Sequence, residues 1–501
     1  MAWTIGAAGL FAFFLKIALL NGMASDAANN ALQAWDLLHG NLSLHGWILA
    51  DVTFYTFDLP LIAVTEALFG VHAIAVHVAL ALIYLIVAVC AVAIAVTDSR
   101  GAARPARAAV VVAVLAAPAL VPTDRWIPLG LPDHTGTTVF LLVSALLIDR
   151  APARRFTAPL LCVILCAGQL SDAVVRYVYA PAIVVVCGYR FLASRKTGTG
   201  DLANLLAAAA SVPLALVARA TMQHFGAYTM VAPNTQLVPV QQWSHSAAAT
   251  WNSIRLLFGV AAPGQVSAGR AAVFGIICML VAAAGILRIL WRWRTARRAE
   301  QVLLVAIAGN LGAYLISALA TGPNSPHDIV TVLPAGAVLG ARAVVPARIA
   351  SRITAFAVSG IALPAALSVL AAATMQPAAV VAQTQLSVWL RDHRLSYGLG
   401  GYWDASSVTV ASGNQVQVRT ITVRGQQVTT YPWDMNTAWF DPSRHYANFV
   451  VFNLVAPHLS LRAERIFGKP ASTQRVGIWE ILIYRKNLLT QVQPAPLPPT
   501  A

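Results

Sequence analysis

The sequence predicts a mainly α-helical, polytopic membrane protein that carries a small extracytoplasmic α+β domain near its C-terminus. Three observations support this fold class. First, 58% of the 501 residues are hydrophobic and only 11% are charged. Second, long apolar runs alternate with short arginine-rich gaps, which is typical of membrane-spanning helices. Third, the composition changes near Gln383, after which polar and apolar residues alternate as they do in strands.

The apolar runs predict about eleven spanning helices, because backbone groups in hydrocarbon must form their hydrogen bonds within the segment. The first run lacks a basic leader and a signal-peptidase motif, so we expect it to be kept as a span. These helices form a predicted membrane module over 1–374, whose first outer loop covers 21–71. The expected spans are 2–20, 72–97, 107–122, 136–149, 157–172, 174–193, 202–220, 269–290, 301–320, 329–346 and 353–374.

Basic residues occupy every second gap between the apolar runs, which is the positive-inside pattern. It predicts a cytoplasmic N-terminus and an extracytoplasmic C-terminal domain. The net charge of +15 is therefore an orientation signal, and we expect no nucleic-acid partner. The high content of alanine and arginine favours a bacterial plasma membrane. The clusters are Arg100, Arg104 and Arg107; Arg150, Arg154 and Arg155; Arg190, Arg195 and Lys196; Arg292, Arg294, Arg297 and Arg298; and Arg342, Arg348 and Arg352.

Residues 383–490 are predicted to form the α+β domain, followed by a disordered proline-rich tail at 491–501. We expect strands within 407–433, 446–455 and 477–485, and short helices within 386–395 and 459–468. The glycine-rich stretch 397–403 is interpreted as a strand or turn without a following phosphate-binding helix. Several aromatic residues either form the core of this domain or stack on sugars, namely Tyr397, Tyr402, Trp403, Trp433, Trp439 and Phe440.

The first outer loop is rich in acids, although the whole chain has only 19 acidic residues. Asp26 is expected in the first turn of a helix that Ser25 caps and that lies along the membrane interface. Asp36 is interpreted as a solvated residue, and Asp58 as the N-cap of the helix that contains Pro60. Asp51 lies among aromatic residues and has no helix to cap, so it is a candidate functional acid.

The loop resembles that of the GT-C superfamily of membrane glycosyltransferases. The resemblance rests on an acid near the start of the loop, the run QAWDLLHGN, the segment Phe-Asp-Leu-Pro-Leu at 57–61, and the Leu-Phe-Gly at 68–70 that ends the next helix. Many members have a His-Pro-Pro-Leu segment where this chain has 57–61, so the resemblance indicates a divergent branch. It implies an enzyme that transfers a sugar from a polyprenyl phosphate to an envelope glycan, lipid or protein on the outer face.

The resemblance also implies roles for individual residues. Asp26 would be the general base of an inverting transfer, and Asp51 would be a second acid that holds the acceptor or a metal. The leaving phosphate needs cations. Candidates on the outer side are Arg125, Arg176 and Lys16.

Further polar residues mark the other outer turns, and each has a structural alternative. Asp133 and His134 could cap one helix, and Asp328, beside His327, could cap another. Asp172 could pair with Arg176 one turn later, or the two could line the phosphate pocket. A divalent cation between Asp51 and one of the His–Asp pairs is a further possibility, so the need for a metal stays open.

Two other classes of function compete with the transferase. A transporter or flippase of a lipid-linked envelope precursor should have polar residues deep in several spans, whereas here they gather at the outer ends. A non-catalytic scaffold with a binding ectodomain would leave the acidic loop unexplained. The chain has no Walker A motif and no dinucleotide fingerprint, and its five cysteines all lie in apolar runs as expected for core residues.

Overall fold

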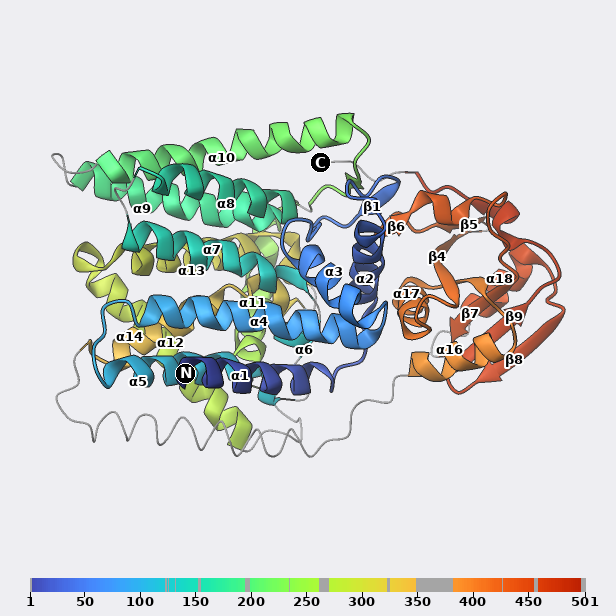
Figure 1. Ribbon diagram of the computed structural model, residues 1–501, viewed down its shortest axis with the longest axis horizontal. Helices are drawn as coiled ribbons and strands as arrows, with labels where there is room; N and C mark the ends of the chain where they lie inside the picture. Colours follow the sequence, from blue (N-terminus) through green and yellow to red (C-terminus); the bar gives the residue numbers. More distant parts are fainter. Residues whose placement is uncertain are drawn as a thin grey trace.

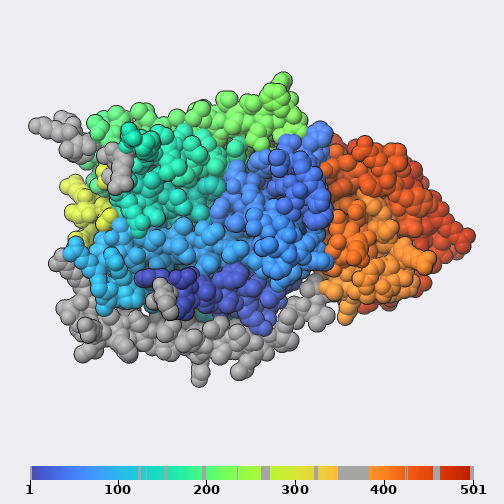
Figure 2. All heavy atoms as spheres, viewed as in Figure 1, coloured from blue at the N-terminus to red at the C-terminus, as the bar shows by residue number. Residues whose placement is uncertain are grey.

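The computed structural model describes residues 2–121, 124, 126–130, 132–151, 155–193, 199–233, 235–260, 270–321, 325–347, 382–425, 427–454 and 458–496. A bundle of roughly parallel helices forms one part of the molecule, and a mixed α/β domain forms the other (Figure 1). The segment 21–71 lies between them, as Figure 2 also shows. The predicted span 353–374 and the candidate Arg125 lie outside the described residues.

Each predicted span from 2–20 to 329–346 coincides with a helix of the bundle. Within the described ranges, six stretches are long and apolar enough to cross a membrane, among them Ala73–Ala95 and Thr199–His224. The chain is therefore a multi-pass helical membrane protein. The helices are α1 (Ala2–Ala18), α4 (Ala73–Ala95), α5 (Ala103–Ala116), α7 (Asp133–Arg150), α8 (Thr157–Ser171), α9 (Ala180–Ala193), α10 (Thr199–His224), α12 (Arg270–Trp291), α13 (Arg298–Ile316) and α14 (Val332–Val344).

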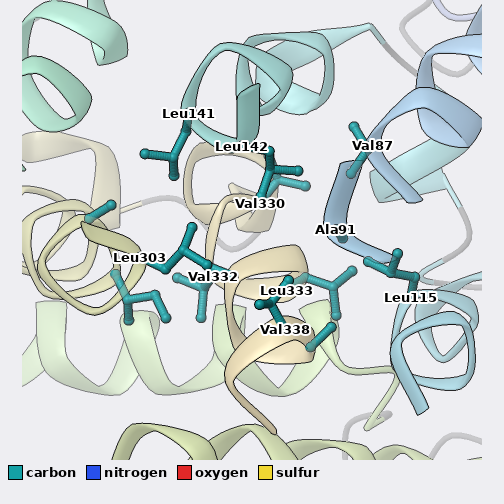
Figure 3. Close-up of a cluster of buried hydrophobic side chains, with 14 of the residues drawn as sticks. Val87, Ala91, Leu115, Leu141, Leu142, Leu303, Val330, Val332, Leu333 and Val338 are labelled. Atoms are coloured by element: carbon teal, nitrogen blue, oxygen red, sulfur yellow. The ribbon is translucent and has the colours of Figure 1, made fainter. Parts of the chain in front are cut away.

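Helix α14 runs through the core of the bundle. Its Leu333 is fully buried and belongs to the same apolar cluster as Val87 of α4, Leu142 of α7 and Leu303 of α13 (Figure 3). Helix α12 packs closely against α14, because a Cβ atom at Gly340 would lie 2.6 Å from the carbonyl oxygen of Val281. Small residues of this kind let membrane helices approach backbone to backbone.

The two ends of the bundle differ in their polar contacts. At the basic end, opposite the C-terminal domain, arginines of the helix termini pair with acids. Asp98 contacts Arg107 at 2.5 Å and Arg342 at 3.0 Å. Two further pairs at this end are Asp149 with Arg297 and Asp201 with Arg298, each at 2.8 Å.

The C-terminal domain contains a seven-stranded sheet in the order β10-β5-β4-β3-β7-β9-β8. The central strand β3 is parallel to both β4 and β7. The strands of this sheet are β3 (Tyr397–Gly400), β4 (Gln417–Arg424), β5 (Gln427–Thr430), β7 (Phe449–Asn453), β8 (Ser472–Val476), β9 (Trp479–Ile483) and β10 (Val492–Gln493). Its helices are α16 (Ala382–Asp392), α17 (Tyr402–Ala411) and α18 (His458–Phe467).

Two expectations for this domain were wrong. Residues 407–411 belong to helix α17 rather than to a strand, although their valines and threonine favour strands. A helix therefore does follow the glycine-rich stretch, with Gly401 at its N-cap. In addition, β10 pairs with β5 inside the segment that we expected to be a disordered tail.

The first outer loop holds helix α2 (Ser25–Leu38), strand β1 (Trp47–Leu49) and helix α3 (Asp58–Phe69). Helix α2 packs against both α3 and α17, and its Asn30 and Gln33 are almost fully buried. Its polar face is thus covered by protein rather than exposed at a membrane interface. Strand β1 also pairs with β2 (Thr229–Met230) and with β6 (Met435–Asn436) of the C-terminal domain, so the loop and that domain share a small sheet.

Candidate functional site

Asp26 lies in the first turn of α2, where helix α17 of the C-terminal domain packs against it. The hydroxyl of Tyr402, the first residue of α17, donates a hydrogen bond to Asp26 Oδ1. Burial raises the pKa of Asp26, and the hydrogen bond from Tyr402 lowers it by less, so the pKa is above its ordinary value. A carboxyl group with a raised pKa is a stronger base once it is ionised.

Asp51 follows strand β1 and is partly buried. Burial raises its pKa to about 6, while the charge of His134 lowers the pKa and the charges of Asp172 and Asp328 raise it. Among the described residues, no other residue donates a hydrogen bond to the Asp51 carboxylate. Within the part of the chain that the structure describes, Asp51 is therefore a carboxylate of raised pKa without a fixed hydrogen-bond partner.

His134, at the start of α7, and Asp172, just after the end of α8, form a buried pair. The Nδ1 atom of His134 lies 2.5 Å from Asp172 Oδ2, which also accepts a hydrogen bond of 2.6 Å from Thr137. Burial acts to lower the pKa of His134, but the charges of Asp172 and Asp328 outweigh it and raise this pKa. Asp172 therefore faces His134 rather than Arg176, and the expected pair of Asp172 with Arg176 was wrong.

His327 lies between two carboxylates in the short helix η6 (Pro326–Ile329). Its ring nitrogens are 3.9 Å from Asp133 Oδ2 and 3.8 Å from Asp328 Oδ1. Neither α7 nor η6 has a side-chain cap, so the expected capping roles of Asp133 and Asp328 were wrong. Both carboxylates instead face histidines, because Asp328 also lies 3.5 Å from His134 Nε2.

Asp58 lies near Asp172, Asp133 and His134, whose charges act on it. Its sequence context wrongly predicted an N-cap. Asp58 is the first residue of α3, makes no capping hydrogen bond, and is almost completely buried. Its carboxyl packs on the backbone of α7, since a Cβ atom at Gly136 would lie 2.1 Å from Asp58 Oδ1. Burial, followed by the charge of Asp172, holds the pKa of Asp58 well above its usual value. The sequence did not predict this buried position, because Asp58 followed by Pro60 matches an ordinary N-cap pattern.

Asp434 is a second member that sequence reasoning missed. It comes from the C-terminal domain, just before strand β6, and only 4% of its surface is exposed. Its Oδ1 atom accepts hydrogen bonds from Gln33 Nε2 at 3.0 Å and from the backbone N–H of Ala50 at 2.9 Å. Burial raises the pKa of Asp434 to about 7. No local pattern marks it, because its partners lie almost 400 residues earlier in the chain.

The structure thus brings most of the predicted site residues to one place, which we call the acidic cluster. Their charges act on one another's pKa values: Asp26 with Asp133 and His327, Asp51 with His134, and Asp434 with both Asp26 and Asp51. No member forms a salt bridge with arginine or lysine within the described part of the chain. The members are Asp26, Asp51, Asp58, Asp133, His134, Asp172, His327, Asp328 and Asp434.

The predicted cations are not part of this cluster. Lys16, in the last turn of α1, forms no salt bridge with any described residue. Arg176 lies in a π-helical turn, η2 (Val175–Tyr179), and its guanidinium covers the ring of Tyr177 at 4.8 Å. The charge of Arg176 acts on buried Arg219 of α10, which the sequence analysis missed. The Nε atoms of both arginines are buried without a hydrogen-bond partner.

Two surface hollows contain no member of the acidic cluster. One, of about 650 Å³, lies between α18 and β8 of the C-terminal domain, at Glu464 and Lys469. The other, of about 340 Å³, lies where the first outer loop meets the end of α10 and is lined mainly by apolar atoms of Leu42, Tyr55 and Phe225. The ring of Tyr55 packs 5.2 Å from that of Tyr228. Burial raises the pKa of the Tyr228 hydroxyl, and the charge of nearby Arg219 lowers it by less. The second hollow is therefore close to the two arginines.

The acidic cluster combines proton acceptors of raised pKa with histidines, which suits the activation of a hydroxyl group. Among the described residues, no three His, Cys, Asp or Glu side chains are arranged as a metal site. Asp26, Asp51, Asp133 and Asp328 are partly exposed, whereas Asp58, Asp172 and Asp434 are buried.

Comparisons with known proteins identify the fold. No known family model and no curated protein matches the sequence. The structure of ArnT from Cupriavidus metallidurans in the apo state has a TM-score of 0.55 and 12% identity, over 99% of each chain. The same protein bound to undecaprenyl phosphate has a TM-score of 0.54 and 11% identity, over 96% of this chain and 98% of that one. The Archaeoglobus fulgidus oligosaccharyltransferase has a TM-score of 0.46 and 11% identity, over 92% and 71%. The two ArnT structures show that the chain shares the overall fold of ArnT.

Proposed function

We propose that the protein is a membrane glycosyltransferase that moves a sugar from a polyprenyl phosphate to an envelope glycan, lipid or protein acceptor. The observation that carries this proposal is the acidic cluster, which lies where the loop, the bundle and the C-terminal domain meet. The fold adds support, because ArnT has been crystallised with undecaprenyl phosphate. We further propose that this site faces the outside of a bacterial plasma membrane and that the N-terminus is cytoplasmic.

In the proposed reaction, Asp26 is the general base. The acceptor hydroxyl oxygen attacks the anomeric carbon of the donor as its proton moves to Asp26. The bond between that carbon and the phosphate oxygen breaks, and the polyprenyl phosphate leaves with the electron pair. A single in-line displacement inverts the configuration at the anomeric carbon. Burial of Asp26 supports this role because it brings the pKa of the carboxyl closer to neutral pH.

Asp51 is the proposed second acid. Its carboxylate has no fixed hydrogen-bond partner among the described residues, so it is free to bind hydroxyl groups of the acceptor. It could also replace Asp26 as the base, because its pKa of about 6 leaves it ionised at neutral pH. Separate substitutions of Asp26 and Asp51 distinguish the two roles, since loss of the base should lower kcat most and loss of a binding group should raise KM.

The donor phosphate is proposed to bind near Arg176 and Arg219 rather than in the acidic cluster, where carboxylates would repel it. These two guanidinium groups influence each other, have no salt-bridge partner within the described ranges, and retain unused Nε donors. An anion between them would relieve their repulsion. The adjacent apolar hollow at Leu42, Tyr55 and Phe225 would suit part of a prenyl chain.

The proposal is tested by transfer in proteoliposomes. Purified protein is reconstituted with a radiolabelled polyprenyl-phosphate sugar and a cell-envelope extract, and the labelled product is measured. Asp26→Asn should lower the rate by about 10²- to 10⁴-fold, whereas Asp392→Asn, on the exposed surface of α16, should leave it unchanged. Undiminished transfer by Asp26→Asn would exclude Asp26 as the base. Label that crosses the membrane without a new glycosidic bond would favour a transporter instead.

A further inference from the structure

One side chain of the C-terminal domain connects the two acid-bearing segments of the first outer loop. Asp434 Oδ1 accepts hydrogen bonds from Gln33 at 3.0 Å and from the N–H of Ala50 at 2.9 Å. Gln33 lies two turns after Asp26 on the same helix, and Ala50 immediately precedes Asp51. A single oxygen atom therefore joins the helix that carries Asp26 to the peptide that carries Asp51.

The backbone around Asp434 fixes the position of this oxygen. Asp434 has a φ of +47°, a left-handed conformation that is uncommon for a residue other than glycine but is tolerated by aspartate. The next two residues, Met435 and Asn436, pair with Ile48 and Trp47 of β1. Asn436 also donates to Asp36 of α2 at 3.4 Å, and Trp47 donates to the same carboxylate oxygen at 2.7 Å. The segment 434–436 is thus held at both of the loop elements that it joins.

This arrangement differs from ordinary domain packing, because it places a buried acid among other acids. The charges of Asp26 and Asp51 both act on Asp434, and an apolar residue would avoid that repulsion. What the carboxyl supplies is an acceptor for two donors that would otherwise be buried without one, and buried unpaired donors are costly. The acceptor at this position therefore fixes Gln33 and Ala50 relative to each other.

We propose that Asp434 is a positioning residue for the transfer reaction, which holds Asp51 at a fixed place relative to Asp26. This inference rests on the proposed function, because it assigns a role to Asp434 in the same site. It implies that the C-terminal domain is part of the catalytic unit. The working group of Asp434 is its hydrogen-bond acceptor rather than its charge, because asparagine offers an equivalent oxygen to Gln33 and Ala50.

The test compares Asp434→Asn, Asp434→Ala and the exposed control Asp392→Ala in the proteoliposome assay, with kcat expressed per folded molecule. Asp434→Ala should lower kcat by about 100-fold while KM for the donor stays within about twofold, because displacement of a catalytic group by about 1 Å has effects of this size. Asp434→Asn should keep kcat within about threefold of the wild type. Asp392→Ala should match the wild type in both constants.

A double substitution tests whether Asp434 acts through Asp51. On an Asp51→Asn background, Asp434→Ala should cause little further loss, because the group that it positions is already absent. Equal kcat for Asp434→Ala and wild type would overturn the inference, as would equal losses for Asp434→Asn and Asp434→Ala. Full additivity of the two substitutions would also overturn it. Failure of the proposed function is distinguishable, because the wild type would then form no glycosidic product at all.

Discussion

The acids at the two ends of the helix bundle have different partners. At the basic end, Asp98, Asp149 and Asp201 each contact at least one arginine at 3.0 Å or less. In the acidic cluster, at the other end, Asp133, Asp172 and Asp328 lie next to histidines. Asp26 accepts a hydrogen bond from Tyr402, and Asp434 accepts hydrogen bonds from Gln33 and Ala50. No arginine or lysine forms a salt bridge with the carboxylates of this cluster in the parts of the chain that the structure describes. Within the described residues, acids are thus paired with arginine at one end and with histidine, or with no basic side chain, at the other.

The pKa values follow from these partners. Burial acts to raise the pKa of Asp98, but Arg342 and Arg107 outweigh burial and hold it below its usual value. Asp51 and Asp434 have no such cations, and burial raises their pKa values to about 6 and about 7. Paired acids of low pKa stabilise a fold, whereas unpaired acids of raised pKa are found at functional sites. The contrast therefore distinguishes acids such as Asp98, whose pKa is lowered, from Asp51 and Asp434, whose pKa values are raised.

The largest expected effect is at the basic end and concerns stability. Asp98→Asn leaves the guanidinium groups of Arg107 and Arg342, which are 2% and 1% exposed, without their shared carboxylate. The free energy of unfolding should fall by about 3 kcal/mol, at the low end for buried pairs because Asp98 itself is partly exposed. Thermal unfolding in detergent measures the change. An unchanged melting temperature would contradict a structural role for this acid, and transfer per folded molecule should equal that of the wild type.

The corresponding change in the acidic cluster should lower the transfer rate without lowering the stability. Asp51→Asn should lower the transfer rate by about 100-fold. The melting temperature should stay the same or rise, because burial disfavours the charged carboxylate of Asp51 and outweighs the favourable charge of His134. If Asp51→Asn lowered the melting temperature as much as Asp98→Asn does, the distinction between the two ends would fail.

The sequence was sufficient to predict the helices of the bundle within the described residues, because each is a local apolar run. It also predicted Asp26, Asp51, His134 and Asp172 as site candidates, because acids and histidines are rare in this chain and were concentrated at the ends of the runs. Asp58 was misread because Asp and Pro in a first turn match an ordinary cap. The partner of each acid was not predictable, because it depends on which helices lie side by side.

Asp434 and Arg219 were missed for related reasons. Asp434 is one of six acids in residues 383–490, and it stands out only through Gln33 and Ala50, which the docked domain brings within reach. Arg219 lies near the end of α10, where a basic residue would be expected to reach the interface. Arg176 was expected to pair with Asp172 at helical spacing, but the π-helical turn changes the spacing on which that expectation rests.

A change of pH should affect the two ends in opposite directions. Asp51 has an ordinary pKa of 3.8 that burial raises to about 6, so the transfer rate should fall about tenfold for each unit below pH 6 as the carboxylate is protonated. Because its folded pKa is raised, ionisation of Asp51 opposes folding as the pH rises from about 4 to about 6. The pKa of Asp98 is lowered from its ordinary value of 3.8. The stabilising effect of Asp98 is therefore lost only as the pH falls below about 3.8. Rates in proteoliposomes from pH 4 to 8 and melting temperatures from about pH 2 to 8 measure both effects, and a rate independent of pH from 5 to 8 would contradict the role of Asp51.

The smallest expected effect concerns the hydrogen bond from Tyr402 to Asp26. Tyr402→Phe removes a donor that lowers the pKa of Asp26, so the pKa should rise and a larger fraction of the base should be protonated at neutral pH. The rate at pH 7 should fall by about three- to tenfold, in line with the loss of one hydrogen bond to a charged group, and should recover towards the wild-type value at higher pH. The matched control is Tyr446→Phe, because Tyr446 is exposed in the same domain and donates only to the carbonyl of Arg485. A fall in rate that did not recover at higher pH would mean that Tyr402 contacts the substrate or orders α17. The difference between the two ends would then involve the aromatic residues of the C-terminal domain as well as its acids.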